Sequence, residues 1–304
     1  MSALARICAT AVGVFAAATI YGAVAASGAA AQTLDRIALA KTVQIGFVAG
    51  QAPFASIGDN GQPVGYAIDL CNRIVEEIGR SISGVKPAYV ETTLDDAFAA
   101  VATGRIDLLC GAITATLGRR ETVDFSQPIF LTGVSGLLRT DSPRDLRELF
   151  LGERTISPPR SPEMRPFATS RVGVRTGTRT EALLRRTVAD EGYGAEILDF
   201  ATHEEGLAAL ESRDIDAYFG DRVLLVELLG KARNPSRLIV ANRLFTREPY
   251  GIAMKRGDAD LRLLVDRTLS RFYATPEFTA LLVKYFADQA RSIQAQVVAQ
   301  SLPE

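Results

Sequence analysis

Two patterns of apolar and polar positions alternate along this chain: short apolar runs, and longer segments in which apolar residues recur every three or four positions. Residues 42–47 (TVQIGF) and 106–110 (IDLLC) are short apolar runs, which are typical of buried strands. Between them, apolar residues recur every three or four positions at 70–78 and again at 94–101, which predicts two amphipathic helices. Strands that alternate with helices predict a mostly parallel sheet flanked by helices, the α/β class.

Two pairs of similar segments indicate that this α/β unit occurs twice. FAAVATGRID at 98–107 resembles LAALESRDID at 207–216, and each joins a helix end to an Ile-Asp pair that begins a strand. Early in each half, VQIGFVAGQ at 43–51 resembles VGVRTGTRT at 172–180. The repetition predicts two lobes with a cleft between them, although many α/β proteins contain short helix–turn–strand segments of this kind.

Residues 141–170, between the two halves, are rich in proline, serine and arginine. This composition predicts an irregular surface excursion that leads into the second lobe, with a docking loop as the functional alternative. Residues 262–290 have an amphipathic helical pattern that is interrupted only near residues 274–276 (ATP). We therefore expect helices to follow the second lobe.

The first 31 residues have the composition of an export signal. Arg6 is the only charged residue before Asp35, an apolar stretch rich in alanine follows it, and small residues occupy positions 29–31. These features predict a secretory signal peptide at 1–31, cleaved near Ala31, with an N-terminal membrane anchor as the alternative. The mature protein is then expected to be exported to the periplasm.

Export permits disulfide formation, and two of the three cysteines lie in the expected mature chain. Cys71 belongs to the apolar stripe of the helix at 70–78, and Cys110 ends the strand at 106–110. We expect both to be buried free thiols that pack as small hydrophobic side chains. The sequence leaves open a bridge between them.

Charge and residue counts exclude several classes of function. Lys and Arg number 34 against 35 for Asp and Glu, a net charge of −1, whereas a nonspecific nucleic-acid partner requires a clustered positive field. A single histidine, His203, and cysteines without paired CxxC spacing predict no metal site. The chain also lacks a GxSxG elbow, a Walker loop and a GxGxxG that opens a helix after a strand, so it carries no catalytic signature.

Two segments are suited to binding an anion. The loop 175–180 (RTGTRT) lies between a predicted strand and a predicted helix, where free N–H groups suit an anion, with ordinary helix capping as the alternative. After the strand at 106–110 come the hydroxyls of Thr114 and Thr116 and then Arg119. Because a guanidinium matches a carboxylate with two hydrogen bonds, these residues form a candidate carboxylate site, unless Arg119 is a solvated helix residue.

Six motifs along the chain occur in a highly specific order and spacing. They are APF (52–54), GYAIDL (65–70), LDDAFAAVATGRIDLLCGAITATLGRRETVDFSQPIF (94–130), VRTGTRTE (174–181), DIDAYFGDR (214–222) and EPYGIAMKRGDADL (248–261). With them, residues 36–290 resemble the periplasmic solute-binding proteins of polar amino-acid ABC transporters, and within that family the glutamate/aspartate-binding branch. The resemblance implies an α/β, bilobed periplasmic-binding-protein fold (type II), shared with the ligand-binding cores of glutamate receptors, in which two α/β lobes are joined by two crossover segments.

The resemblance also assigns residues to the two charged ends of an amino acid. Arg119 is expected to hold the α-carboxylate beside the hydroxyl and N–H of Thr114, and Thr178 to add a contact from the second lobe. Asp221 is expected to accept the α-ammonium, with help from the carbonyl group of Ala112. These roles agree with the need of a zwitterion for an anion site and a cation site close together in a cleft with little water.

The walls of the cleft are assigned in the same way. The resemblance implies that Phe54 and Leu94 line its apolar surface. Gln51 stands where many relatives carry an aromatic lid, so we expect less stacking on the ligand here.

The side chain of the ligand is the least determined part of the resemblance. The acidic-ligand branch carries arginines at the positions of Val48 and Ala97, which this chain lacks, and Arg179 and His203 are left to meet a side-chain carboxylate. If Arg179 points into the cleft, an acidic or amide side chain is favoured, and if it points to solvent, a smaller neutral polar ligand is favoured. Cationic ligands are disfavoured, because no spare cleft carboxylate is evident.

The expected division of the chain follows from the same motifs. After the signal peptide, residues 32–133 are the first part of lobe 1, residues 134–248 are lobe 2, and residues 249–304 return to lobe 1 and end in a tail. The crossings are expected near 131–135 and 246–250.

The expected function is capture of one polar L-amino acid, with glutamate, aspartate or glutamine preferred. Hinge closure around the ligand would be followed by delivery to an inner-membrane ABC permease. We expect a monomer without a cofactor, an enzymatic activity or a nucleic-acid partner. The alternative is an exported cyclohexadienyl (arogenate/prephenate) dehydratase, which resembles the same fold; it requires a general acid in the cleft, where Asp221 is the one strongly placed carboxylate.

Overall fold

Two five-stranded sheets organise the part of the chain that the computed structural model describes, residues 33–152, 165–192 and 194–303. The first sheet has the order β4 (Lys86–Glu91), β1 (Thr42–Phe47), β5 (Leu108–Leu109), β14 (Ala253–Lys255) and β6 (Val123–Phe125). The second has the order β10 (Glu196–Phe200), β9 (Arg171–Arg175), β11 (Ala217–Asp221), β8 (Val134–Arg139) and β12 (Leu238–Val240). The expected signal peptide at 1–31 lies outside the described residues.

The two sheets are built alike. In each, three neighbouring strands are parallel and a fourth runs antiparallel to the third and to the fifth. The similar segments of the sequence occupy equivalent places, because 43–51 and 172–180 contain β1 and β9, while 98–107 and 207–216 lead into β5 and β11. The prediction of two α/β lobes is confirmed, and the sequence similarity reflects the repeated unit.

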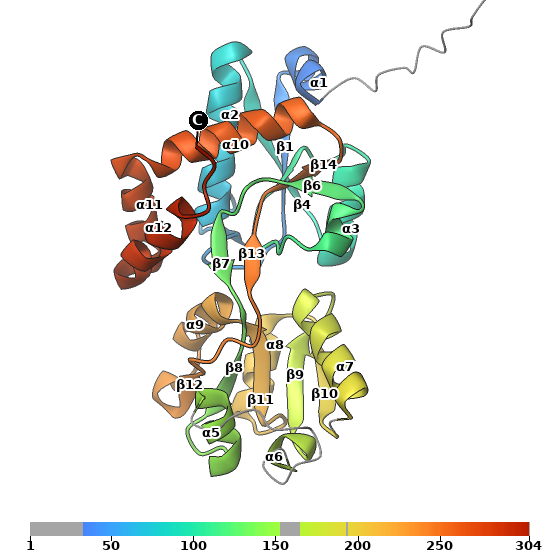
Figure 1. The fold of residues 1–304 in the computed structure, drawn as a ribbon, viewed down its shortest axis with the longest axis vertical. Coiled ribbons are helices and arrows are strands. Elements are labelled where there is room, and N and C mark those ends of the chain that lie inside the picture. The colour runs from blue at the N-terminus through green and yellow to red at the C-terminus, as the bar shows by residue number, and fades with distance from the viewer. Residues whose placement is uncertain (1–32, 153–164, 193, 304) are drawn as a thin grey trace, which may run out of the picture. The chain divides into compact units, whose positions relative to one another are not determined.

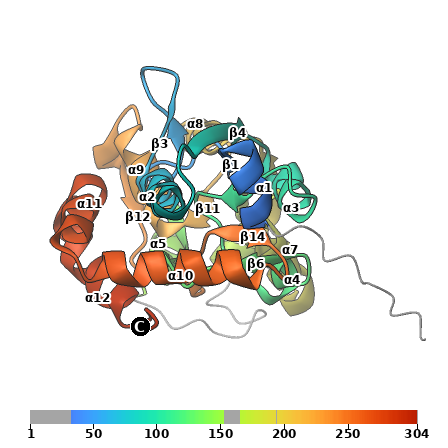
Figure 2. The same ribbon diagram turned by 90° about the horizontal axis from the view of Figure 1, so that it is seen from above.

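Helices accompany both sheets. Those of the first lobe are α1 (Thr33–Ala40), α2 (Tyr66–Ser81), α3 (Leu94–Ala102), α4 (Leu117–Arg120), α10 (Ala259–Tyr273), α11 (Pro276–Phe286) and α12 (Ala290–Val298). Those of the second are α5 (Arg144–Leu151), α6 (Arg165–Ala168), α7 (Arg179–Glu191), α8 (His203–Glu211) and α9 (Arg222–Gly230). α10 packs on α2, and α11 and α12 lie together beyond the end of α10 (Figure 2). No helix among the described residues is long and apolar enough to cross a membrane.

The chain passes between the sheets in two extended segments. β7 (Phe130–Thr132) follows β6 and precedes β8, and β13 (Glu248–Tyr250) follows β12 and precedes β14. The two strands pair antiparallel and lie side by side between the sheets (Figure 1). A two-residue hairpin ladder, β2 (Ser56–Ile57) with β3 (Pro63–Val64), precedes α2. The lobe boundaries at 133/134 and 248/249 stay predictions.

The expectation of two free thiols is wrong, because Cys71 and Cys110 form a disulfide. Side chains alternate across a strand, so Leu108 and Cys110 face one hydrophobic cluster while Leu109 faces another. The cluster that contains Cys110 also contains the buried face of α2, with Cys71 in it. Both thiols therefore point into the same layer, which the two separate patterns in the sequence do not reveal.

The segment 141–170 is also less irregular than its composition predicts. It contains α5, whose Leu146, Leu149 and Phe150 are buried at the spacing of one helical face. Residues 153–164, the most proline-rich part, lie outside the described residues. The predicted helices near the C-terminus are confirmed, with the break at Thr275, which caps α11.

Candidate functional site

One pocket brings together nine of the ten residues that the sequence singles out. Its lining from the first lobe is Gln51, Leu94, Ala112, Thr114 and Arg119, and from the second Arg175, Thr178, Arg179, Thr180, His203, Phe219, Gly220, Asp221 and Leu224. Most of these residues follow the carboxyl ends of parallel strands, where α/β sheets bind ligands. The pocket therefore lies where both lobes present their strand ends.

Arg119 supplies a cationic fork on the wall of the first lobe. Its backbone N–H donates to Thr116 Oγ1 at 3.1 Å, which caps the short helix α4, and its Nη1 donates to the Thr114 carbonyl oxygen at 2.8 Å. The guanidinium carbon lies 4.5 Å from the centre of the Phe98 ring. The Thr114 hydroxyl has no hydrogen-bond partner among the described residues. Burial lowers the pKa of Arg119 from its ordinary value, but a guanidinium stays protonated in proteins.

Arg120 differs from its neighbour in position. It is exposed, does not line the pocket, and has its guanidinium carbon 5.8 Å from the centre of the Phe125 ring. Adjacent helical residues point about 100° apart, so only Arg119 faces the pocket.

Asp221 supplies an anionic group from the second lobe. It ends β11 and begins α9, and its Oδ2 accepts a hydrogen bond from the Tyr250 hydroxyl. Burial raises the pKa of Asp221 to about 6, and the Tyr250 hydrogen bond partly offsets this rise. On the opposite wall the Ala112 N–H donates to Gln51 Oε1 at 3.0 Å, and no described residue donates to the Ala112 carbonyl oxygen. An ammonium group has both acceptors within the same pocket.

Thr178 caps α7 at the point where the loop after β9 leads into that helix. Its hydroxyl donates to the Arg175 carbonyl oxygen at 2.7 Å and accepts from the Glu181 N–H at 3.1 Å. The hydroxyl proton is thus already used, and the free N–H groups of the first helical turn are the donors left for an anion. We therefore expect a contact between Thr178 and a ligand to involve its backbone rather than its hydroxyl proton.

The two lobes meet beside this loop. A Cβ atom added to Gly177 would lie 3.0 Å from Asp95 Oδ1 and 3.5 Å from Leu94 Cβ, both at the start of α3. Gly177 has φ +74, which disfavours any other residue. The approach of Leu94 to this glycine brings the first lobe to the edge of the pocket.

Arg179 lines the pocket but is already paired. Its Nε donates to both carboxylate oxygens of Glu248 at 2.8 Å, and the Glu248 side chain is 1% exposed. Glu248 does not line the pocket and is already paired, so the expectation that the cleft holds no spare carboxylate stays a prediction. The motif EPYG contains Glu248, but nothing in the sequence indicates that a residue 69 positions from Arg179 would meet it.

His203 and Arg175 form the remaining polar wall. His203 Nδ1 lies 3.0 Å from the Tyr218 hydroxyl, and burial lowers the pKa of His203 to about 4, so the imidazole is neutral at pH 7. Arg175 ends β9, and its Nε donates to the Ala201 carbonyl oxygen at 3.2 Å. Within the described residues Arg175 has no carboxylate partner, and sequence reasoning gave it no role although it begins the RTGTRT loop.

The structure does not bring Phe54 to the pocket. Phe54 is 0% exposed, and its ring packs edge-on against Tyr66, Phe130 and Tyr250, with centroids 6.0, 4.9 and 5.1 Å away. The expectation that Phe54 lines the cleft is wrong, because the ring supports the crossover strands from behind.

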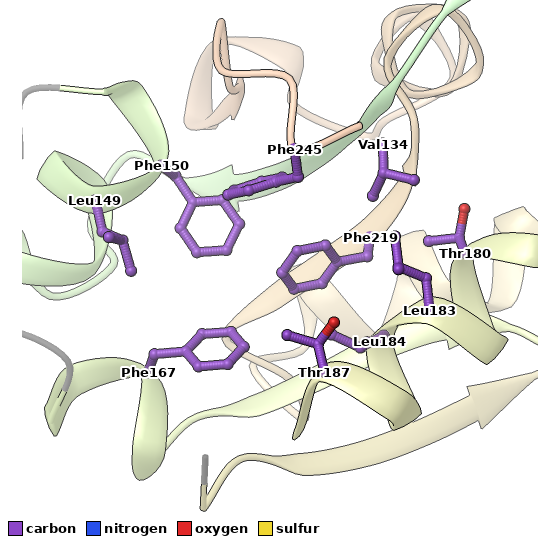
Figure 3. A pocket seen from close by; sticks show the side chains of 10 residues that line it. All are labelled: Val134, Leu149, Phe150, Phe167, Thr180, Leu183, Leu184, Thr187, Phe219 and Phe245. Atoms are coloured by element: carbon purple, nitrogen blue, oxygen red, sulfur yellow. The ribbon is translucent and has the colours of Figure 1, made fainter. Parts of the chain in front are cut away.

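A second cavity lies in the second lobe, between α5, α6, α7 and the sheet (Figure 3). Its walls carry only apolar side chains and two threonines, and Thr180 and Phe219 line both this cavity and the first pocket. Figure 3 shows the rings of Phe150, Phe167 and Phe219 turned toward its interior. Among the described residues no charged side chain lines it, so of these two cavities only the first offers charged partners to a zwitterion. No group of three or more His, Cys, Asp or Glu side chains in the described part is arranged to hold a metal ion.

Residues 43–288 match the family model of the bacterial extracellular solute-binding proteins, family 3. The chain belongs to this family. An L-glutamate/L-aspartate-binding protein of Pseudomonas aeruginosa is 28% identical to this family member over 258 residues, 84% of this chain and 80% of that protein. An L-cystine-binding protein of Escherichia coli is 25% identical and covers 90% of this chain and 93% of its own length.

Solved structures agree with the fold of this solute-binding protein. An ancestral amino acid-binding protein, described as a precursor of cyclohexadienyl dehydratase, is 27% identical with a TM-score of 0.69, and the match covers 84% of this chain and 100% of that one. These relatives carry the names of binding proteins rather than enzymes.

Proposed function

We propose that this solute-binding protein captures one free amino acid between its lobes. Arg119 and the N–H groups near it would hold the α-carboxylate, and Asp221 with the Ala112 carbonyl oxygen would hold the α-ammonium. The observation that carries the proposal is that a cation of the first lobe and a carboxylate of the second line one pocket. A ligand that bridges both favours the closed arrangement, because it binds that arrangement more tightly than an open one.

The charges around the pocket support an acidic amino acid as the preferred ligand. Arg119, Arg175 and Arg179 line the pocket, against Asp221 in the lining and Glu248 bonded to Arg179. With three cations and two carboxylates, a ligand of charge −1 leaves the closed site neutral, whereas a cationic ligand adds to an existing excess. Glutamate and aspartate fit this balance, and glutamine is the nearest neutral ligand. The name of the Pseudomonas aeruginosa relative supports the same choice.

The names of the relatives support a partner in the membrane. A glutamine-binding relative from Bacillus subtilis is named as part of an ABC transporter. By analogy, we propose that this protein is exported with loss of residues 1–31, acts in the periplasm as a monomer, and delivers its ligand to an ABC permease.

Calorimetry of residues 32–304 against a panel of amino acids tests the proposal. We expect one site per chain, with glutamate or aspartate bound most tightly, glutamine more weakly, and lysine and arginine not at all. A ligand that binds only the native state also raises the melting temperature, because at a ligand concentration of 100 times Kd it adds about 2.7 kcal/mol to the free energy of unfolding. Absence of binding by every amino acid contradicts the function, whereas a preference for lysine or arginine contradicts only the choice of ligand.

Arg175 is the cation that we propose to meet the ligand's side-chain carboxylate. Substitution Arg175→Ala is expected to weaken glutamate binding about tenfold more than glutamine binding, since a hydrogen-bonded charge contributes about 1.5–3 kcal/mol. Arg171 begins the same strand at its far end and is exposed, so Arg171→Ala is the matched control and should leave the ratio unchanged. Equal losses for both ligands would remove Arg175 from side-chain recognition.

The dehydratase alternative has less support. Asp221 accepts a hydrogen bond from Tyr250, which arranges it as an acceptor, as ammonium binding requires, rather than as a general acid. Incubation with arogenate or prephenate should therefore give no aromatic product, and a steady release of product would favour the enzyme.

A further inference from the structure

Glu248 is a buried carboxylate that enters the charge balance above but to which the proposed binding mode assigns no contact with the ligand. It lies on the crossover strand β13, does not line the pocket, and is 1% exposed, so water screens its charge poorly. Its two oxygens accept only from Arg179 Nε among the described residues, both at 2.8 Å. A charge buried this deeply requires a paired counter-charge.

The two side chains of the Arg179–Glu248 pair differ in exposure. Arg179 lines the pocket and its side chain is 40% exposed, while Glu248 stays behind it. The Nη groups of Arg179 have no partner among the described residues, so its donors are available even though its charge is balanced. The field of Glu248 also reaches the neighbouring groups, because it raises the pKa of Asp221 and opposes the lowering of the pKa of Arg119.

We propose that Glu248 sets the ligand selectivity of the pocket by neutralising Arg179. The pocket then keeps one net positive charge, which the side-chain carboxylate of one ligand balances. This inference rests on the proposed function. Without the charge of Glu248 the pocket gains a second unbalanced cation, which attracts an acidic amino acid and leaves a neutral amide of the same shape almost unaffected. Glu248 does not touch the ligand, so it is a positioning residue that acts through Arg179.

The test is the ratio of glutamine Kd to glutamate Kd, measured by calorimetry at neutral pH. Glu248→Gln keeps the shape and an oxygen acceptor for Arg179, and we expect the ratio to rise about five- to tenfold, mainly through tighter glutamate binding. The double variant Glu248→Gln with Arg179→Gln replaces the ion pair by two neutral groups, so its ratio should return to the wild-type value. Glu248→Asp keeps the charge and should keep the ratio, even where its shorter side chain lowers stability.

Asp107 offers a matched control elsewhere in the chain. Its side chain is 2% exposed and pairs with Arg36, which is 37% exposed, so the pair resembles Arg179–Glu248 but lies away from the pocket. Asp107→Asn should leave the ratio unchanged.

The outcomes separate the two proposals. An unchanged or lowered ratio in Glu248→Gln, or equal changes for both ligands, overturns the selectivity role while the wild type still binds. A wild type that binds no amino acid overturns the proposed function itself, and the inference with it. If Glu248→Gln does not fold, Arg179→Gln gives the reciprocal result: it leaves the negative charge unbalanced and should lower the ratio, and a raised ratio would overturn the role.

Discussion

Replacement of Arg119 by alanine is the most direct test of how the pocket binds a ligand. The change removes the guanidinium that would meet the ligand α-carboxylate, and the carboxylate would then enter the pocket without its charged partner. Removing one partner of a buried ion pair costs about 3–5 kcal/mol. At about 1.4 kcal/mol per factor of ten, affinity should fall by roughly two to three and a half orders of magnitude.

The fold should survive this substitution. In the free protein the Arg119 side chain makes one hydrogen bond to a described residue, at the Thr114 carbonyl oxygen, and one cation–π contact, with Phe98. A cation–π contact at a partly exposed site contributes about 0.5–1 kcal/mol, which is small compared with the free energy of unfolding of a domain. Circular dichroism and a melting curve of the unliganded variant check that the loss is one of binding.

Calorimetry with two ligands makes the assignment specific. The wild type should bind an amino acid tightly and its α-carboxamide weakly, whereas Arg119→Ala should bind both equally weakly, because the group that distinguishes them is gone. Arg120→Ala is the matched control, since Arg120 is exposed and lies over Phe125, and its affinity should stay within about a factor of two. A larger loss in Arg120→Ala than in Arg119→Ala, or a variant Arg119→Ala that still prefers the free carboxylate, would refute the reasoning.

Three further perturbations have definite expected results. Burial raises the pKa of Asp221 to about 6, and the ligand ammonium requires the ionised form of this carboxyl group. Glutamine affinity should therefore be constant above pH 7 and fall about tenfold per pH unit well below pH 6. A flat calorimetric profile from pH 7.5 to 5 would contradict this. Gly177→Ala brings a Cβ to 3.0 Å from Asp95 at a positive φ, so calorimetry should give an affinity about five- to tenfold lower. Loss of the Cys71–Cys110 disulfide in the double alanine variant should lower the free energy of unfolding by about 2–4 kcal/mol in urea titrations, with ligand affinity unchanged.

Part of the candidate site can be predicted from where strands end. Arg119 and the loop that contains Thr178 follow predicted strands, and parallel strands of an α/β sheet present those ends along one edge, whereas Asp221 is assigned by the resemblance to the family. The repeat of the α/β unit then indicates a second such edge facing the first. Such positions can be predicted without any knowledge of side-chain contacts, but the role of each residue comes from the resemblance.

Features that depend on packing between distant segments were missed. The resemblance assigns Phe54 to the cleft wall, but the ring fits against three aromatic side chains from other elements. The Cys71–Cys110 bridge and the Arg179–Glu248 pair likewise join segments whose approach is decided by the whole fold. A periodic pattern indicates which face of an element is buried, but not which residue of another element it meets.

The crossover strand β13 bonds to polar groups of the pocket and of both lobes. Glu248 and Tyr250 lie two residues apart, so they project from the same face of the strand, and they bond to Arg179 and Asp221 of the second lobe. Between them, the Pro249 carbonyl oxygen accepts from the Ala115 N–H, next to Thr114 of the first lobe. A change of backbone angle in β13 must therefore move side chains that hold the ligand-binding groups. Because β13 bonds to groups of both lobes, we expect substitutions in it to alter ligand affinity without contacting the ligand.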